Sequence, residues 1–119
     1  SIMLLVATDA PLSDRNLTRL ARRALSGLSR TGAAMSNGSG DYVLAFSTAP
    51  EVRRKAIGEG QLRTTVELPN EQISPLFQAV IEATEEAIYN SLCKATTMQG
   101  YRDHRVEALP LNTLVVSRS

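Results

Sequence analysis

The sequence predicts an α/β (α+β) fold in which apolar strands pack in layers against two amphipathic helices. Two short apolar runs, residues 2–8 and 42–47, are typical of strands. Two longer segments repeat their apolar residues at helical spacing. The composition, 43% hydrophobic and 21% charged over 119 residues, is that of a globular chain. No linker or internal repeat divides the sequence, so residues 1–119 are predicted to form a single domain.

The first strand is expected to be covered on both faces. Residues 2–8 lack the alternation of apolar and polar side chains that a half-exposed strand shows. Asp9, Ala10 and Pro11 then end the run. Two strands buried on both faces need more neighbours than two helices supply, which suggests that a partner chain covers them.

The first helix is predicted to begin after Ser13, a favourable N-cap residue. Its apolar stripe contains Leu17, Leu20, Ala21, Ala24, Leu25 and Leu28. Its opposite face contains Arg15, Arg19, Arg22 and Arg23. We interpret these arginines as a solvated face rather than an anion site, because an amphipathic helix needs such a face in any case.

A loop rich in glycine, serine and asparagine, TGAAMSNGSG, separates this helix from the second strand at residues 42–47. Phosphate-binding glycine loops lead into a helix N-terminus, whereas this loop leads into the strand YVLAF. Nucleotide binding is therefore not predicted. Residues 49–63 show no sustained periodicity and are expected to form an exposed loop.

The second helix is predicted to start with Ser74 as its cap and Pro75 at the first helical position. Its apolar stripe runs to about residue 96, and Gly100 is expected to end it. The stripe contains Leu76, Phe77, Val80, Ile81, Ala87, Ile88, Leu92 and Ala95. The segment HRVEALPLNTLVV then supplies a short extended segment and a turn.

Charge and residue counts exclude several classes of function. Thirteen basic and twelve acidic residues give a net charge of +1, which leaves no footprint for nucleic acid. The apolar run at residues 2–7 is far shorter than the ~20 residues of a membrane span. Cys93 is predicted to be a small core residue and His104 to lie in a polar turn, and the two share no catalytic motif. We expect no metal and no cofactor.

The serine at position 1, directly before a strand, has three explanations. Removal of an initiator methionine, an arbitrary boundary, and cleavage of a longer precursor would each leave it there. In the third case the serine is a new N-terminus, which carries a free α-amino group beside its hydroxyl.

Five segments together resemble the β-subunit of DmpA-type aminopeptidases, a group that includes the L-aminopeptidase/D-esterase enzymes and the β-peptidyl aminopeptidases. The segments are SIMLLVATDAPL, LTRLARRALSGLSRTG, NGSGDYVLAFSTA, ISPLFQAVIEATEEAIYNSLCKATT and HRVEALPL. The likeness covers nearly the whole chain in order, and only residues 51–63 match weakly.

The resemblance implies how the protein is made and assembled. These enzymes arise from a precursor that cuts itself before a serine, which leaves an α-subunit and a shorter β-subunit that begins with the nucleophile. Residues 1–119 would then be the C-terminal (β) subunit, in a layered αββα sandwich completed by a separate α-subunit. Several αβ pairs would assemble into an oligomer. The oxyanion-stabilising groups and much of the substrate pocket would belong to the α-subunit.

An N-terminal serine can serve as both nucleophile and base. A serine hydroxyl needs a base to take its proton, and an α-amino group in a simple peptide has a pKa of about 7.7–8.0, so much of it is neutral near pH 7.5. Ser1 would supply both groups, and the strand behind it would hold them in place.

The resemblance also marks two residues of the NGSGD segment. Ser39 and Asp41 stand where relatives carry a serine and an acidic residue, glutamate in some of them, that contact the nucleophile. Ser39 would hydrogen-bond the Ser1 hydroxyl, and Asp41 would orient or stabilise the amino group. An ordinary turn with an Asx-type cap explains the same residues without catalysis.

Three functions are therefore considered. The first is an aminopeptidase that releases N-terminal residues from short peptides, amides or esters through Ser1. The second is a self-cleaving acyltransferase of the ornithine acetyltransferase type, although those enzymes use a terminal threonine. The third is a non-catalytic subunit domain. We expect a cytoplasmic protein, with the periplasm as the alternative, and neither a nucleic acid nor a membrane as a partner.

Overall fold

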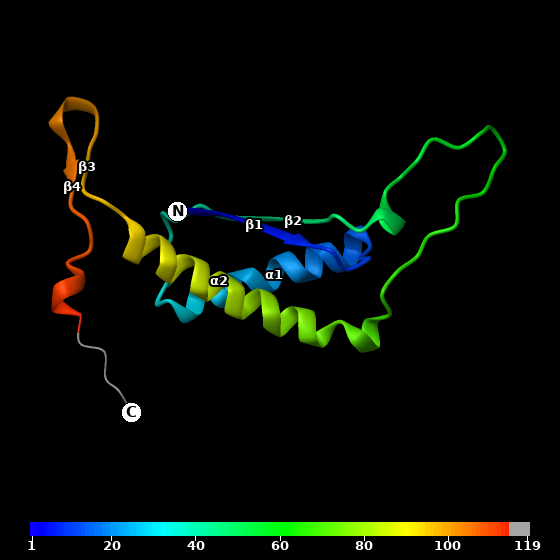
Figure 1. The fold of residues 1–119 in the computed structure, drawn as a ribbon, viewed down its shortest axis with the longest axis horizontal. Coiled ribbons are helices and arrows are strands. Elements are labelled where there is room, and N and C mark those ends of the chain that lie inside the picture. Colours follow the sequence, from blue (N-terminus) through cyan, green and yellow to red (C-terminus); the bar gives the residue numbers. More distant parts are fainter. Residues whose placement is uncertain (115–119) are drawn as a thin grey trace.

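The computed structural model describes residues 1–114. Strand β1 (Ile2–Thr8) leads into helix α1 (Asp14–Arg30), which is followed by strand β2 (Asp41–Ser47) and helix α2 (Ser74–Lys94). A small hairpin of β3 (Met98–Gln99) and β4 (Arg105–Val106) comes last. Figure 1 shows β1 and β2 side by side above the two helices, so the structure has one sheet layer and one helix layer. The predicted mixture of strands and helices is confirmed.

Strands β1 and β2 are parallel, with Ile2 opposite Asp41 and Thr8 opposite Ser47. Helix α1 connects them, as parallel strands require a crossover. The helices cover one face of this two-stranded sheet and leave the other bare. The bare face exposes Met3 (66%), Leu5 (68%), Tyr42 (66%), Leu44 (58%) and Phe46 (43%). Cover on both faces, predicted from the sequence, is therefore not provided by the described residues themselves.

The core lies between the sheet and the helices. Its buried side chains are Leu12, Leu20, Ala24, Ile73 and Val80. The helices cross closely at Gly27, because a Cβ there would lie only 2.6 Å from the carbonyl oxygen of Ile81 and 2.7 Å from the Cβ of Thr84. A side chain at position 27 would force the helices apart.

The helix ends confirm one prediction and correct two. Ser13 is the N-cap of α1 and accepts a hydrogen bond from the backbone N–H of Asn16, as predicted. The prediction that Ser74 caps α2 is wrong, because a 3₁₀ turn at Asn70–Gln72 runs into the helix and Ile73, 1% exposed, takes the N-cap position. The prediction that Gly100 ends α2 is also wrong. The helix stops at Lys94 because the chain turns extended at the next residue.

One prediction about side-chain burial is wrong, and another is confirmed only in part. Cys93 is exposed rather than part of the core, since the C-terminal part of α2 extends beyond α1 and the sheet. The arginine face of α1 is only partly solvated. The guanidinium groups of Arg19 and Arg23 lie 5.1 Å and 3.9 Å from the ring centre of Phe77, so they stack on α2. Arg15 and Arg22 are exposed, as predicted.

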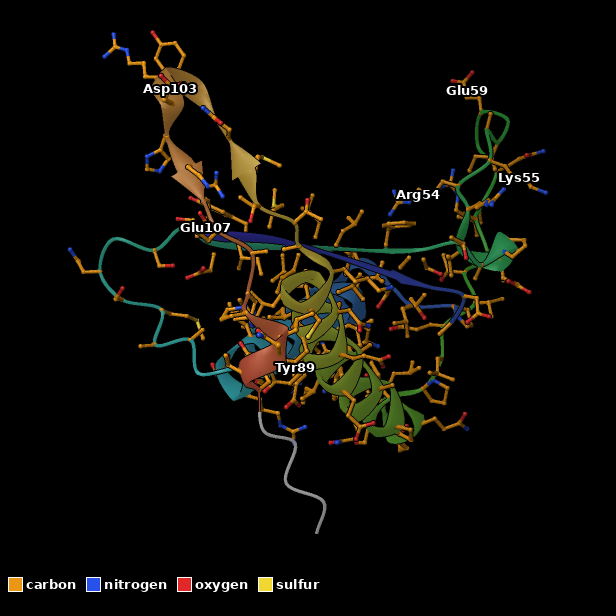
Figure 2. All side chains as sticks on the ribbon, turned by 60° about the vertical axis from the view of Figure 1, so that its left-hand side comes forward. Arg54, Lys55, Glu59, Tyr89, Asp103 and Glu107 are labelled. Carbon is orange, nitrogen blue, oxygen red and sulfur yellow. The ribbon has the colours of Figure 1, made fainter. Side chains whose placement is uncertain are left out.

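Two arms extend from this core. Residues 53–67 form a long exposed excursion, and the β3–β4 hairpin projects from the other end (Figure 1). In Figure 2, Arg54, Lys55 and Glu59 lie on the first arm and Asp103 on the second. The radius of gyration is 19.3 Å, against about 13.5 Å for a compact domain of this length. The exposed loop predicted at residues 49–63 is confirmed from residue 53 onward, whereas Ala49 is buried and Pro50–Val52 form a 3₁₀ turn. Val115 and Val116 of the predicted last segment lie outside the described residues.

Candidate active site

Ser1 stands at the head of β1, beside the loop that precedes β2. The backbone N–H of Gly40 donates a hydrogen bond to the Oγ of Ser1 at 3.0 Å. The next backbone contact runs the other way, from the N–H of Ile2 to the carbonyl oxygen of Gly40 at 3.2 Å. These two bonds extend the strand pairing to the first residue. They hold an exposed serine hydroxyl at a fixed place on the sheet edge.

Ser39 and Asp41 lie on either side of this contact. The hydroxyl of Ser39 donates to the Oδ1 of Asp41 at 2.9 Å, and both residues are half-buried. The structure thus brings Ser1, Ser39 and Asp41 to one corner of the sheet. The hydroxyl that sequence reasoning pairs with Ser1 is instead paired with Asp41, and no ion pair joins the Ser1 amine to Asp41 within residues 1–114. The catalytic roles of the three residues remain predictions.

Sequence reasoning missed Gly40. The residue acts through its backbone N–H and through its lack of a side chain, and neither property is visible in a search for reactive side chains. A Cβ at position 40 would lie 3.6 Å from the Oγ of Ser1 and 3.4 Å from the Cε2 of Tyr42. The available signal was a glycine between the two marked residues of NGSGD, where a backbone approaches another group closely.

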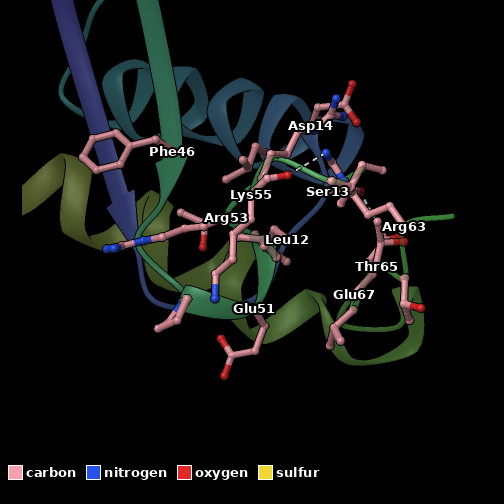
Figure 3. Close-up of a pocket in the computed structure, with 18 of the residues that line it drawn as sticks. Leu12, Ser13, Asp14, Phe46, Glu51, Arg53, Lys55, Arg63, Thr65 and Glu67 are labelled. Carbon is pink, nitrogen blue, oxygen red and sulfur yellow. Dashed lines mark hydrogen bonds between the residues drawn. The ribbon is translucent and has the colours of Figure 1, made fainter. Parts of the chain in front are cut away.

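A cavity of about 850 Å³ lies elsewhere, at the opposite end of the strands. It is lined by residues 45–47 of β2, by the start of α1 and by the arm of residues 53–67 (Figure 3). A strand of seven residues separates this cavity from Ser1, a distance of about 20 Å. The cavity is formed by an exposed arm, and the hydroxyl of Ser47 at its strand end donates to the carbonyl oxygen of Ala10 and accepts from the N–H of Ala49. We therefore place the candidate active site at Ser1 instead.

The other groups considered from the sequence do not form a second site. Cys93 is exposed near the end of α2, and His104 is exposed between the hairpin strands. The backbone of His104 accepts a hydrogen bond from Gly100 at 2.7 Å and so closes the hairpin turn. Within residues 1–114 no group of three or more His, Cys, Asp or Glu side chains could hold a metal ion. No helix in that part of the chain is long and apolar enough to cross a membrane.

The fold corresponds to that of a known class of hydrolases. The structure aligns, with a TM-score of 0.79 and 34% sequence identity, with the L-aminopeptidase D-Ala-esterase/amidase of Ochrobactrum anthropi. That enzyme is described as a prototype for the serine aminopeptidases and as a new variant of the Ntn hydrolase fold. The alignment covers 94% of this chain and 31% of that one. This chain therefore shares the fold of part of an Ntn hydrolase.

Residues 1–106 match Peptidase family S58, and the chain belongs to that family. It is 43% identical, over 110 residues, to a beta-peptidyl aminopeptidase BapA of Sphingosinicella microcystinivorans. The PH0078 protein of Pyrococcus horikoshii OT3 has a similar structure, with a TM-score of 0.84 and 49% identity over 94% of this chain and 31% of that one. The match to BapA covers 92% of this chain but 27% of the relative. The resemblance stated from the sequence is confirmed, and the chain spans less than a third of the length of these relatives.

Proposed function

We propose that this chain is the nucleophile-bearing C-terminal (β) subunit of an aminopeptidase that releases N-terminal residues from short peptides, amides or esters. The observation that carries the proposal is the hydrogen bond from the Gly40 N–H to the Oγ of Ser1 at the head of β1. Membership of a peptidase family and similarity to two aminopeptidases support the reaction class. The names of those relatives, which include an esterase and amidase, support the range of acyl substrates.

In the proposed reaction, the Oγ of Ser1 bonds to the carbonyl carbon of the substrate's N-terminal residue. The hydroxyl proton passes to the α-amine of Ser1 in its neutral form. Breakage of the scissile bond releases the leaving amine or alcohol, which takes this proton, and leaves an ester on Ser1. A water molecule then attacks the ester and gives its proton to the α-amine. The ammonium group returns this proton to the Oγ of Ser1 as the ester bond breaks, which releases the acid and regenerates Ser1.

The surrounding groups position the nucleophile. The Gly40 N–H engages one lone pair of the Ser1 Oγ and fixes where the hydroxyl lies. Asp41 carries a carboxylate on the neighbouring strand, and its bond to Ser39 limits the orientations that this carboxylate can adopt. Groups that are held in place before the reaction need little further ordering in the transition state. The fixed positions of the Ser1 hydroxyl and the Asp41 carboxylate therefore support a catalytic role for these residues.

We also propose that Ser1 becomes N-terminal by cleavage of a longer precursor, in which the same hydroxyl attacks the preceding peptide carbonyl. The upstream part would be the α-subunit. Two observations support such a partner: the chain spans less than a third of its relatives, and one face of the sheet exposes a row of large apolar side chains. A second sheet on that face would complete an αββα sandwich. Further assembly into several αβ pairs belongs to the same proposal.

The experiment uses the full-length precursor with Ser1→Ala, Ser1→Cys or Ser36→Ala. Ser36 is an exposed serine of the same loop and serves as the matched control. Chain cleavage is followed by intact mass, and turnover by hydrolysis of an amino-acid p-nitroanilide. We expect Ser1→Ala to block cleavage and to lower turnover by at least about 10⁴-fold, as loss of a serine nucleophile does elsewhere. Ser1→Cys retains partial cleavage. Normal cleavage and turnover in Ser1→Ala would refute the proposal.

A further inference from the structure

Tyr42 lies next to the candidate nucleophile without a role in the reaction described above. It is the second residue of β2 and is 66% exposed on the bare face of the sheet. Side chains alternate between the two faces of a strand, so position 40 lies on the same face as Tyr42. Tyr42 pairs with Met3, and Met3 lies two residues from Ser1. The ring of Tyr42 is therefore the next side chain along this face from the Ser1–Gly40 contact, on the side of the sheet that the helices leave open.

Gly40 leaves a small space between the hydroxyl and the ring. The point where a Cβ would stand on Gly40 is 3.6 Å from the Oγ of Ser1 and 3.4 Å from the Cε2 of Tyr42. Among the described residues, no other atom outside positions 39–41 comes within 4 Å of that point. The hydroxyl and the ring thus flank one open position, and the backbone of Gly40 forms its floor.

A substrate must bring an atom close to this position. The reacting carbonyl carbon approaches a nucleophilic oxygen to about 3–3.5 Å before the bond forms. The side chain of the same residue is two bonds from that carbon, so it reaches the space over Gly40 and the ring beyond it. Aromatic rings give apolar side chains a large and rigid contact surface. A ring at this place can therefore contact the side chain of the residue whose carbonyl is attacked, and so discriminate between substrates by that side chain.

We propose that Gly40 and Tyr42 form the subsite for the side chain of the substrate's N-terminal residue, with Gly40 as its floor and Tyr42 as its apolar wall. The subsite favours a substrate whose N-terminal residue has an apolar side chain over one whose N-terminal residue is glycine. This inference rests on the proposed function, because it takes Ser1 as the attacking group. It adds a specificity-determining residue that belongs to this chain and not to its partner.

The competing explanation is that Tyr42 merely packs against whatever covers the bare face. Leu44 separates the two explanations. It lies two residues further along β2 on the same face and is 58% exposed, so it would share a packing role. It is also two residues, or about 7 Å, farther along the strand from Gly40, beyond the space described above.

The test uses the assembled enzyme with Tyr42→Ala, Tyr42→Phe or Leu44→Ala. The measured quantity is kcat/KM for leucyl p-nitroanilide divided by kcat/KM for glycyl p-nitroanilide. We expect Tyr42→Ala to lower this ratio at least about tenfold, the scale of a lost apolar contact in a substrate pocket. Tyr42→Phe keeps the ratio within about threefold, because the ring remains. An unchanged or higher ratio in Tyr42→Ala, or an equal fall in Leu44→Ala, would overturn the proposal.

A binding measurement keeps this inference separate from the proposed function. Leucinol and 2-aminoethanol have the amine and the side chain of the two substrates but no carbonyl to attack. Calorimetry on the same assembled variants gives the ratio of their Kd values. We expect Tyr42→Ala to raise the Kd of leucinol about tenfold and to change the Kd of 2-aminoethanol little. If wild-type enzyme fails to hydrolyse either substrate while this pattern holds, the proposed function and the subsite's part in the reaction fail, and only the apolar contact with Tyr42 stands. If hydrolysis is normal and leucinol binds Tyr42→Ala as tightly as wild type, only the subsite fails.

Discussion

The hydroxyl of Ser39 donates a hydrogen bond to the Oδ1 of Asp41 at 2.9 Å, across the glycine whose N–H contacts Ser1. The two side chains stand two residues apart, the spacing that puts both on one side of an extended chain. The bond fixes the carboxylate at the start of β2, opposite Ile2. A direct role of this carboxylate on the Ser1 amine is a prediction that variants of the two residues can test.

The first prediction concerns these two side chains. Ser39→Ala removes the bond to the carboxylate, and Asp41→Asn removes the charge while it keeps the shape. We expect each change to lower kcat for a small amide substrate by tenfold or more, which is about 1.4 kcal/mol of lost transition-state stabilisation. The measurement is steady-state turnover of the assembled enzyme, with Ser36→Ala as the control in the same loop.

A structural role would give a different result for the same variants. If Ser39 and Asp41 serve only as a turn, Ser39→Ala and Asp41→Asn lower the Tm and leave kcat close to the wild-type value. Wild-type turnover in both variants would contradict the catalytic role and leave the two residues as the turn that the sequence also allows.

The elements with a clear local pattern were predictable from the sequence. The wrong predictions concern features whose structure is determined by contact with a neighbouring element. The spacing of apolar residues and the cap at Ser13 predict α1 correctly, because both signals are local. The start of α2 does not follow from Ser74 and Pro75, since a preceding 3₁₀ turn already sets the helix at Ile73. The stacking of Arg23 on Phe77 joins two helices and leaves no trace in the spacing of either one.

In the candidate site, too, the sequence indicated individual residues but not the contacts between residues far apart in the chain. The residues of NGSGD were marked through a family resemblance, whereas spacing within the chain pairs none of them with Ser1. The contact that the structure shows, from the Gly40 N–H to the Ser1 hydroxyl, depends on the register of two strands separated by a helix. Register of that kind is set by packing of the whole layer. A backbone donor of this type is invisible in a sequence.

The second prediction concerns the helix crossing at Gly27. A methyl group there would lie 2.6 Å from a backbone carbonyl oxygen of α2, which cannot move without the helix. We expect Gly27→Ala to destabilise the protein by about 1–3 kcal/mol, the usual cost of overpacking a core. The measurement is the denaturant midpoint of the assembled protein. Gly38→Ala is the control, because nothing lies within 4 Å of a Cβ at that position. Equal stability of the two variants would contradict the close crossing.

The third prediction concerns the bare face of the sheet. Leu5 is 68% exposed in the middle of that face, so a partner sheet would bury it. We expect Leu5→Lys, introduced in the full-length protein, to prevent assembly, because burial of an unpaired ammonium group costs several kcal/mol. Size-exclusion chromatography and soluble yield report the assembled species. The control is Ala83→Lys, an exposed position on α2 in the helix layer. A Leu5→Lys protein that assembles normally would show that solvent, and not a partner, meets this face.

The last prediction concerns the α-amine of Ser1, because this group distinguishes the proposed mechanism from that of an ordinary serine hydrolase. A general base must be neutral to accept the hydroxyl proton, and the ammonium form cannot do so. Selective acetylation of this amine, which leaves the Ser1 hydroxyl free, should abolish turnover at every pH while the assembly stays intact by size-exclusion chromatography.

The other amines of this chain belong to Lys55 and Lys94. Replacing both with arginine before acetylation removes them as targets, and peptide mass confirms the modified site. Full turnover with a verified acetyl group on Ser1 would exclude its amine as the base and would direct the search to a base on the partner chain.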